Sequence, residues 1–421
     1  MNLFDSIAEA ALKHYSTLSG NGKPNDKEWT VYSAIVAVKQ QQPQSKVFVV
    51  SSGTGSKCLG YDQVSKSCDC LLRDSHAEVL ARRGFVFATI SQMDALSRNL
   101  SLSESTSFVS FSKALNTDTV SKIANFSITP AVSFYLYISD SPCGDSTIYD
   151  LDDNHVKFTG AKLPTSTSDS SLSISFVREP NHQATSLMRL KPGRSNIKPE
   201  SRTRSMSCSD KIVRWNKLGL LGGALRPFGF SDTGYFKGVV VSADNTYATS
   251  QLSALTRSLA DRSGAGEQKK RKLSVHVTTN HIFTRSKSNA DEVKRSNENN
   301  KKAWLSSSGM SINYNVMDGV EVTLGGNGLK QRTKKKKKKK RKLGEEETQG
   351  GEENENENAA SSRLSRVRLN EMLRRLGNRL TNSRKFDNYS DFKKDEEYVR
   401  ERTSCFKEEG ECLHGWVETN S

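Results

Sequence analysis

Apolar residues at the start of the chain recur at helical intervals and then change to the spacing of strands. Residues 3–16 predict an amphipathic helix whose apolar face is formed by Leu3, Ile7, Ala10, Ala11 and Tyr15. Residues 29–38 and 46–51 are rich in β-branched and aromatic side chains, which predicts two strands. The glycine-containing residues 52–58 are expected to form a loop that leaves the second strand.

Further along, helical and extended patterns continue to alternate. The predicted elements are a helix from His76 to about Met93, a strand at Ala131–Ile138, a helix that begins near Cys208, and a helix at Arg363–Leu380. The segment that follows the Ala131–Ile138 strand also predicts a helix start, just after Cys143. Strands and helices mixed in this order indicate an α/β protein.

The chain is strongly basic, with a formal charge of +16 and a sequence pI near 9.4. Residues 330–342 carry eleven lysines and arginines, and residues 345–357 carry seven glutamates. These runs have a net charge of +4, so about +12 of the +16 is spread over the rest of the chain. The charge therefore favours a polyanionic partner such as nucleic acid. The low-complexity residues 330–360 are expected to be a disordered insertion.

The cysteines indicate a reducing compartment. The chain has seven of them, an odd number, and the residues before Tyr15 form a helical pattern with two acids in place of a secretory signal. No apolar run is long enough for a membrane span. In the cytosol or nucleus, cysteines more often bind metals or take part in catalysis than form disulfides.

Two residues near the start of the predicted helix could carry chemistry. His76 and Glu78 form a His-x-Glu pair, in which the imidazole would hold zinc and the carboxylate would move protons without touching the metal, as in zinc deaminases. A simpler interpretation needs no metal. Ser75, followed three residues later by Glu78 and then by apolar residues, also fits a capping box.

Cys143 could supply a second zinc ligand, since a helix N-terminus favours the thiolate that binds the metal. In the deaminase pattern Pro-Cys-x-x-Cys another thiolate follows three residues later, but position 146 of this chain is Ser. A catalytic zinc needs three protein ligands and one open position, so the third ligand must come from elsewhere. The candidates are Cys58, Cys68, Cys70, Cys208, Cys405 and Cys412, of which Cys208 is the strongest because it opens a predicted helix.

Several stretches together resemble the family of adenosine deaminases acting on RNA, and within it the tRNA-specific branch that converts adenosine 37 of alanine tRNA to inosine. The matching stretches are Ala11–Tyr15, Gly22–Pro24, Glu28–Thr30, Gly53–Cys58, Asp74–Glu78, Ser139–Asp145, Lys191–Arg194, Arg202–Lys211, Arg214–Asn216 and Gly415–Glu418. They span the chain from end to end, and those that contain cysteine are the most specific.

The resemblance implies a cytidine-deaminase-like mixed sheet flanked by helices, in a single adenosine-deaminase (editase) domain over residues 1–421 that contains the 330–360 insertion. It implies one catalytic zinc held by His76, Cys143 and Cys208. Glu78 would take a proton from the attacking water and return it to the purine ring and the leaving ammonia, at an adenosine flipped out of its stack. A structural zinc site, with a fourth protein ligand and no adjacent carboxylate, is the alternative.

The family also buries one inositol hexakisphosphate, and the resemblance extends to that ligand. The corresponding contact positions are Val79, Arg82, Arg83, Lys191, Lys211, Arg214, Trp215, Tyr389, Lys393, Tyr398 and Trp416. Asp74 and Lys211 would link the zinc ligands to the inositol phosphate. Gly223 and Thr419 depart from the Ser and Lys of the family's messenger-RNA editors. On spacing alone, the same arginines could instead be surface residues that hold tRNA phosphates.

Several features favour tRNA as the substrate. We expect no double-stranded-RNA-binding domain ahead of the first helix, and Thr147 stands where messenger-RNA editors have Arg. Ser56 and Lys57 are candidate contacts to the base, ribose or phosphate. A double-stranded or messenger-RNA editor and a non-enzymatic RNA-binding paralogue are the rival interpretations. We expect a monomer without membrane contact, in the nucleus, the cytoplasm or both, and Lys334–Lys342 with Lys269–Lys272 could be a nuclear signal, an RNA contact or an inert insert.

Overall fold

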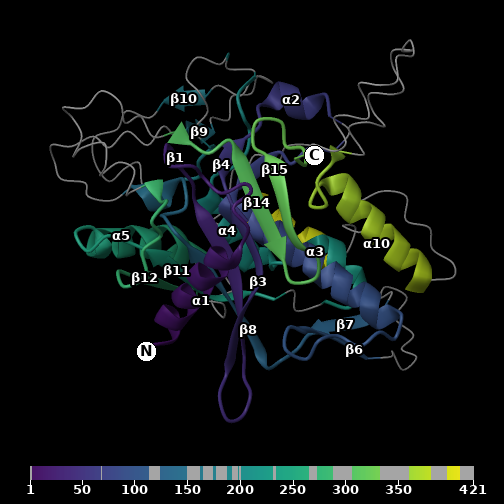
Figure 1. Ribbon diagram of the computed structural model, residues 1–421. Coiled ribbons are helices and arrows are strands. Elements are labelled where there is room, and N and C mark those ends of the chain that lie inside the picture. The colour runs from purple at the N-terminus through teal and green to yellow at the C-terminus, as the bar shows by residue number, and fades with distance from the viewer. Residues whose placement is uncertain are drawn as a thin grey trace, which may run out of the picture.

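A seven-stranded mixed sheet forms the centre of the protein, as the computed structural model shows (Figure 1). The structure describes residues 2–67, 69–112, 124–148, 162–164, 174–176, 187–191, 198, 201–230, 234–264, 273–287, 306–331, 360–380 and 396–407. The strands, in their order across the sheet, are β12 (Ser274–Thr278), β11 (Phe236–Ser242), β8 (Val132–Ile138), β2 (Tyr32–Lys39), β3 (Lys46–Thr54), β14 (Met310–Asn315) and β15 (Gly319–Leu324).

The sheet is parallel on one side and antiparallel on the other. β8, β11 and β12 run parallel to one another, whereas each pair from β8 through β2, β3 and β14 to β15 is antiparallel. The predicted α/β class and the predicted strand at 131–138 are therefore confirmed.

Strand β2 lies in the middle of the sheet and is buried on both faces, which explains its nearly continuous apolar sequence. Ile35 and Ala37 join the core cluster on the side of α3 (Ala77–Ser97), whereas Ala34 and Val36 join the cluster on the side of α1 (Leu3–Thr17). Alternate residues of a strand point to opposite faces, so β2 contributes to both cores. The predicted strand at 29–38 is interrupted at residues 30–31, which separate β2 from β1 (Glu28–Trp29).

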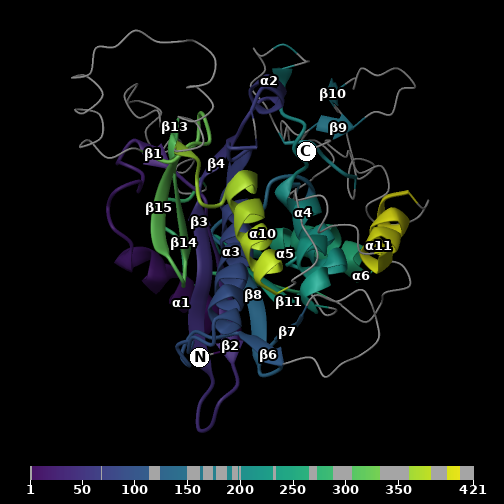
Figure 2. The same cartoon turned by 90° about the vertical axis from the view of Figure 1, so that its right-hand side faces the viewer.

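The first helix, α1, covers one face of the sheet, as predicted (Figure 2). The Asn2 side chain caps it by accepting a hydrogen bond from the Asp5 backbone N–H. Its buried residues are Ile7, Ala8 and Ala11. The prediction that Leu3 belongs to the apolar face was wrong, because Leu3 is 40% exposed at the helix end.

On the opposite face, α3 packs against β3 so closely that the contact requires glycine. A Cβ atom at Gly53 would lie 2.6 Å from the Cβ of Leu80 and 2.7 Å from the carbonyl oxygen of Ala77. The prediction of a loop at 52–58 was wrong for this reason: β3 continues to Thr54, and β4 (Ser56–Cys58) follows after one residue. The glycine at 53 serves close packing and not a turn.

The remaining elements surround this core. They are α2 (Tyr61–Ser65), β5 (Asp74–His76), β6 (Val109–Ser112), β7 (Asn125–Ile128), the 3-10 turn η1 (Asp145–Thr147), β9 (Lys162–Pro164), β10 (Ile174–Phe176), α4 (Cys208–Leu218), the 3-10 helix η4 (Gly223–Phe228), α5 (Ala248–Leu255), the π-helix η5 (Thr256–Asp261), α6 (Arg262–Gly264), β13 (Ser306–Ser307), α10 (Arg366–Leu380) and α11 (Glu396–Lys407). The helices expected near Cys208 and at 363–380 are confirmed, although α10 begins three residues late. No helix of the described part of the chain has the length and apolar character needed to cross a membrane.

Most of the expected insertion, residues 332–359, lies outside the described residues. The segments on either side of it meet, however. Leu329 and Ser361 form an antiparallel bridge, and the backbone N–H of Lys330 donates to the carbonyl of Ala360 at 2.9 Å. The described residues on the two sides of the expected insertion are therefore neighbours in the fold, and sequence added between neighbouring ends disturbs a core least.

Candidate metal centre and active site

His76 lies at the junction of β5 and α3. β5 pairs with β4, and His76 stands opposite Ser56 in this pairing. The helix begins at Ala77, with His76 as its N-cap residue and no side-chain capping bond. The alternative interpretation, a capping box of Ser75 and Glu78, was wrong, because the N-cap position is taken by His76 and Ser75 lies one residue before it in β5. Glu78 is therefore not occupied with capping the helix.

Cys143 follows strand β8, but the helix expected after it is only the short turn η1. Between them, Gly144 adopts a φ of 109°, and a Cβ atom there would lie 2.3 Å from the Oγ of Ser207. Glycine is thus required both by the backbone conformation and by the close approach of α4.

A different helix, α4, supplies the N-terminus that faces Cys143. The Ser207 side chain caps α4 by accepting from the backbone N–H of Asp210, and Cys208 is the first helical residue. The backbone N–H of Cys208 donates to the Cys143 sulfur at 3.3 Å. A hydrogen bond from the Cys208 side chain lowers the pKa of the Cys143 thiol well below its usual range, although burial opposes this shift. Cys143 therefore does face a helix N-terminus, as expected, but the helix is α4.

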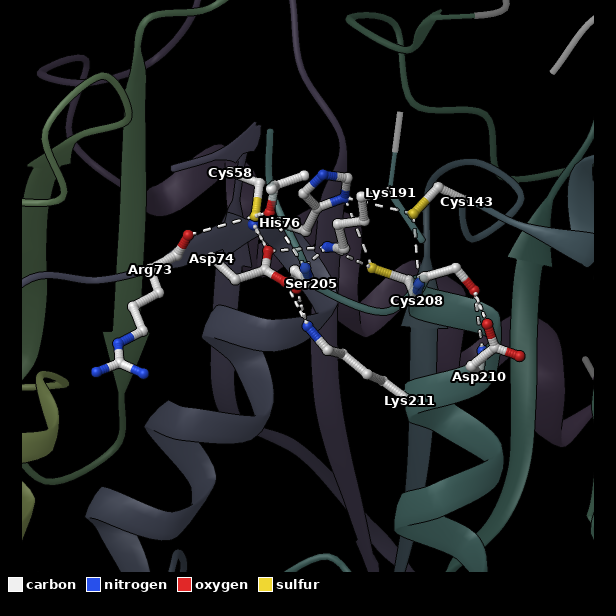
Figure 3. Close-up of polar contacts among 12 residues, drawn as sticks. Cys58, Arg73, Asp74, His76, Cys143, Lys191, Ser205, Cys208, Asp210 and Lys211 are labelled. Carbon is white, nitrogen blue, oxygen red and sulfur yellow. Dashed lines mark hydrogen bonds and ion pairs between the residues drawn. The ribbon is translucent and has the colours of Figure 1, made fainter. Parts of the chain in front are cut away.

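His76, Cys143 and Cys208 come together although they are far apart in sequence (Figure 3). The Nδ1 atom of His76 lies 3.6 Å from the Cys208 sulfur and 3.8 Å from the Cys143 sulfur. Tetrahedral zinc with ordinary bond lengths would separate nitrogen and sulfur ligands by about 3.6 Å. The three ligand atoms all lie within 4.8 Å of one another, so their identity and spacing fit a zinc ion.

The other cysteines of the described residues do not join this group. The Cys58 sulfur contacts the Thr203 hydroxyl at 3.1 Å, and Cys405 is buried in the main core cluster. Cys70 is buried elsewhere, and Cys68 and Cys412 lie outside the described residues. Within the described chain, the metal-ligating group contains three protein ligands and no fourth, which fits a site with one open position better than a structural zinc.

The Glu78 carboxylate is buried next to this group. Glu78 is 2% exposed, and its Oε2 atom has no hydrogen-bond partner among the described residues. Burial raises the pKa of Glu78, and the neighbouring Cys143 acts in the same direction while His76 opposes it. A buried carboxylate with an unused oxygen is suited to bind water or a substrate nitrogen.

A buried ion network connects the cluster to α4. The ammonium of Lys191 donates to the Cys208 sulfur at 3.2 Å and to Asp74 at 2.8 Å, and Asp74 also pairs with Lys211 at 2.5 Å (Figure 3). Burial would raise the pKa of Asp74, but the two lysines outweigh it and hold that pKa well below its usual range. The expected Asp74–Lys211 link is therefore present.

Two residues of this network were not predicted to belong to it. Lys191 is predicted as an inositol phosphate contact, and in the structure its fully buried side chain bonds Cys208 and Asp74. Ser205, which donates to Asp74 at 2.8 Å and accepts from Lys211 at 2.6 Å, was not singled out. The only available signal was its position in the Arg202–Lys211 motif, because a serine gives no pattern of its own.

Of the basic residues expected to hold inositol phosphate, Arg82 and Arg83 lie on α3, and Lys211 and Arg214 lie on α4. The Nε of Arg82 donates to the Leu220 carbonyl, and its guanidinium lies 5.6 Å from the centre of the Trp215 ring. The guanidinium of Arg214 lies 5.2 Å from the Phe406 ring, and the Nε of Arg83 donates to the Leu364 carbonyl. Val79 is buried in the main core cluster. Tyr389, Lys393, Trp416 and Thr419 lie outside the described residues.

Gly223, one of the two departures from the messenger-RNA editors, has a physical explanation. A Cβ atom at this position would lie 2.4 Å from the ring of Tyr398, which is buried against η4. The Tyr398 ring also lies 5.4 Å from the guanidinium of Arg226, which pairs with Glu401 at 2.5 Å. The missing side chain at 223 thus makes room for an aromatic residue of α11.

The candidate substrate contacts lie on backbone segments next to those that carry the metal-ligating group. Ser56 stands opposite His76 in the β4–β5 pair, and Lys57 opposite Ser75. The Lys57 ammonium donates to the Ser307 hydroxyl at 2.5 Å. Thr147 lies in η1, four residues after Cys143, and its hydroxyl donates to the Gly144 carbonyl.

Comparison with known proteins gives a consistent family. The profile of the adenosine-deaminase (editase) domain matches residues 51–346. The chain is 32% identical over 274 residues to tRNA-specific adenosine deaminase 1 of Drosophila melanogaster, covering 61% of this chain and 58% of that protein. It is 27% identical over 230 residues to tRNA-specific adenosine deaminase 1 of Saccharomyces cerevisiae, covering 52% and 54%. It is 28% identical over 229 residues to double-stranded RNA-specific adenosine deaminase of Mus musculus, covering 53% and 18%.

These matches define the family at the level of the domain. The chain spans about half the length of the two tRNA-specific relatives and less than a fifth of the mouse protein. The domain match covers more than half of this chain and contains His76, Glu78, Cys143 and Cys208. The chain belongs to the adenosine-deaminase (editase) domain family.

Proposed function

We propose that this protein is a zinc-dependent hydrolase that converts adenosine to inosine in tRNA. The observation that carries the proposal is the grouping of His76, Cys143 and Cys208 beside the buried carboxylate of Glu78. This is the ligand set and the proton carrier that hydrolytic nucleobase deamination requires. Two of the matched relatives are tRNA-specific adenosine deaminases by name, which supports tRNA as the substrate class.

The roles of the residues follow from their positions. Zinc, when bound, supplies the Lewis acidity that lets a water molecule lose a proton near neutral pH. Glu78 would accept that proton and pass it to the ring nitrogen of the purine; it would then take a second proton, from the hydroxyl added at C6, and pass it to the amino group, which leaves as ammonia when its bond to C6 breaks. The raised pKa of Glu78 suits a group that must both take and give a proton in one cycle. His76, Cys143 and Cys208 hold the metal and leave one position open.

Within tRNA, we propose adenosine 37 of alanine tRNA as the target. The support is the sequence resemblance to the tRNA-specific branch and the identity of Thr147, which stands where messenger-RNA editors have Arg. Editing of double-stranded or messenger RNA is the second candidate, and the similarity to the mouse double-stranded RNA-specific enzyme favours it. The two candidates differ in the substrate that they require, so one experiment can separate them.

We further propose that one inositol hexakisphosphate is buried where α3, α4, η4 and α11 meet. The support is the position of Arg82 and Arg83 on α3 and of Lys211 and Arg214 on α4, with Arg82 near the Trp215 ring and Arg214 near the Phe406 ring. All four side chains are partly buried, and cations partly removed from water are stabilised by anions, which a highly phosphorylated ligand would supply. Acid denaturation of the protein should release one such ligand per chain, which mass spectrometry would detect. Release of none from active protein would contradict this assignment.

For localisation, we propose that Lys334–Lys342 directs the protein to the nucleus. These residues lie outside the described part of the chain. Replacing the lysines by Gln in the full chain should move a fluorescent fusion toward the cytoplasm. An unchanged nuclear fraction would reject the signal and leave an RNA contact to be tested by the salt dependence of tRNA binding.

The function is tested by incubating the purified protein with mixed tRNA and sequencing for A-to-G changes. The expected result is conversion at position 37 of alanine tRNA. A transcript with guanosine at that position is the matched control. Conversion in a long duplex but in no tRNA would favour the second candidate. Conversion in neither substrate by zinc-loaded protein would contradict the proposed activity.

A further inference from the structure

The two cysteine ligands lie on segments that share one neighbour. Cys143 precedes the turn η1, Cys208 begins α4, and the π-helix η5 with the first residue of α6 contacts both segments through side chains. π-helices are rare, and they occur frequently at functional sites. Three residues make the contacts, and we call Arg257, Ser258 and Arg262 the π-helical clamp.

Arg257 holds the segment that follows Cys143. Its guanidinium Nη2 donates to the carbonyl of Asp145 at 3.1 Å and to the carbonyl of Ile148 at 2.8 Å, and its Nε lies 3.6 Å from the Asp145 carboxylate. The Asp145 side chain is fully buried, so this contact is shielded from water. One arginine thus spans the whole of η1 and fixes the chain on the C-terminal side of the Cys143 ligand.

Ser258 joins the two ligand segments through hydroxyl groups. Its Oγ lies 2.6 Å from that of Ser146, which in turn accepts a hydrogen bond from the Ser209 hydroxyl at 2.9 Å. All three serines are fully buried. The Ser209 hydroxyl also lies 3.0 Å from the carbonyl oxygen of Cys143, so its single hydrogen is shared between that carbonyl and Ser146. Ser146, at the position where other deaminases have a second cysteine, therefore connects η5, η1 and the residue next to Cys208.

Arg262 holds the start of α4. It pairs with Asp210 at 2.8 Å, and both side chains are almost completely buried. The same carboxylate accepts from the hydroxyl of Ser207 at 2.6 Å and from the backbone N–H of Arg189 at 2.9 Å. Because Ser207 caps α4 and Asp210 lies two residues after Cys208, this ion pair fixes the first turn of the helix that carries the ligand.

We propose that the π-helical clamp is a positioning element that sets the distance and orientation of the two thiolates. This inference rests on the proposed zinc function, and it concerns residues that touch neither metal nor substrate. Residues that hydrogen-bond to metal ligands commonly determine the orientation of those ligands. Their mutation typically weakens metal affinity about 10-fold to 100-fold. The three residues of the clamp contact both ligand segments from one short helical stretch. Removal of these contacts therefore allows the two sulfurs to move independently of each other.

The test measures metal binding directly, in purified full-length variants. Zinc affinity is determined by competition with a chelator, and the cobalt-substituted protein reports thiolate geometry through its sulfur-to-metal charge-transfer bands. We expect R257M to bind zinc about 10-fold more weakly and to change the cobalt spectrum. R257K should fall between R257M and the unmodified protein, because a lysine keeps the charge but does not reproduce the fork of the guanidinium. S258A, which removes one hydroxyl, should show a smaller change.

R379M is the matched control. Arg379 is similarly exposed, at 35% against 28% for Arg257, and it contacts Asp94 and Ser97 at the far end of α3. R379M should match the unmodified protein in zinc affinity and in cobalt spectrum. Equal zinc affinities and cobalt spectra for R257M and R379M would reject the proposed positioning role of the clamp. If R257M does not fold, the same two measurements on S258A test the proposal. If the unmodified protein itself bound neither metal, the proposed function would fail together with the inference.

Discussion

The helices α3 and α4 both begin at a proposed zinc ligand, yet their N-termini are built in different ways. α3 starts without a side-chain cap, and its second residue, Glu78, keeps one buried oxygen without a hydrogen-bond partner among the described residues. α4 starts with the Ser207 cap, and the backbone N–H of its first residue, Cys208, is used by the Cys143 sulfur. The Cys208 sulfur accepts from Lys191.

This difference separates two tasks within one site. The thiolate side is saturated with internal hydrogen bonds, which hold the ligands in place before any metal arrives. On the side of His76 and Glu78, one carboxylate oxygen of Glu78 has no hydrogen-bond partner among the described residues. This oxygen is available to bind water or a nucleobase. Variants on the thiolate side should therefore act on metal binding, and variants of Glu78 should act on the reaction.

The largest effect is expected from C208A. Removing one of three ligands should abolish stoichiometric zinc binding and, with it, inosine formation. Elemental analysis of the purified protein measures the metal. C58A is the matched control, because the Cys58 thiol contacts Thr203 and is not part of the metal-ligating group. Unchanged zinc content in C208A would mean that the third ligand has been assigned to the wrong residue.

The next effect is expected from E78A, on the other side of the comparison. Loss of a general acid–base group typically lowers a rate about 10²-fold to 10⁴-fold, and E78A should do so while it retains one zinc per chain. Single-turnover conversion of tRNA measures the rate, and elemental analysis measures the zinc. If E78A kept its activity, the proposed proton transfer would be wrong.

A smaller effect is expected from S207A, which removes the cap of α4. The loss of an N-cap costs about 1 kcal/mol of unfolding free energy, and here it should also weaken zinc binding. N2A provides the control, because Asn2 caps α1 in the same way, and α1 packs in a different core cluster from Cys208. Both variants should lower stability in urea by similar amounts, whereas only S207A should release zinc faster to a chelator. Identical zinc release would show that capping does not influence the ligands.

The smallest effect on metal binding and on the reaction is expected from His14, which instead influences the pH dependence of stability. Burial lowers the pKa of His14 to about 4, so the folded protein keeps this imidazole neutral while the unfolded chain takes up a proton below pH 6.5. This contribution is present above about pH 6.5 and is lost as the pH falls toward 4, by about 1.4 kcal/mol for each unit of pKa shift. H14Q should flatten the pH dependence of the unfolding free energy in that range. Parallel curves for the two proteins would contradict it.

The sequence was sufficient where local pattern decides the structure. The amphipathic helix α1, the β8 strand and the helix that opens at Cys208 follow from periodicity and capping residues. The sequence was insufficient where a segment distant along the chain decides the local structure. Gly53 looks like a turn residue, but it is part of a strand because α3 packs directly on it.

The site shows the same division. The motifs around His76 and Cys143 were visible locally, and Cys208 was favoured among six cysteines because it opens a predicted helix, but the meeting of the three residues is a property of the fold. The helix N-terminus expected to follow Cys143 comes instead from α4, and no local pattern could assign it. Lys191, Arg257 and Arg262 act through partners more than fifteen residues away, so spacing gave no signal for their contacts.

X-ray absorption of the zinc-loaded protein tests the central claim most directly, because it identifies the atoms bound to the metal. The account predicts two sulfur ligands at about 2.3 Å and two nitrogen or oxygen ligands at about 2.0 Å, which correspond to Cys143, Cys208, His76 and one water. C208A should lose this signal. A shell of four protein ligands, or a shell with one sulfur or none, would contradict the account.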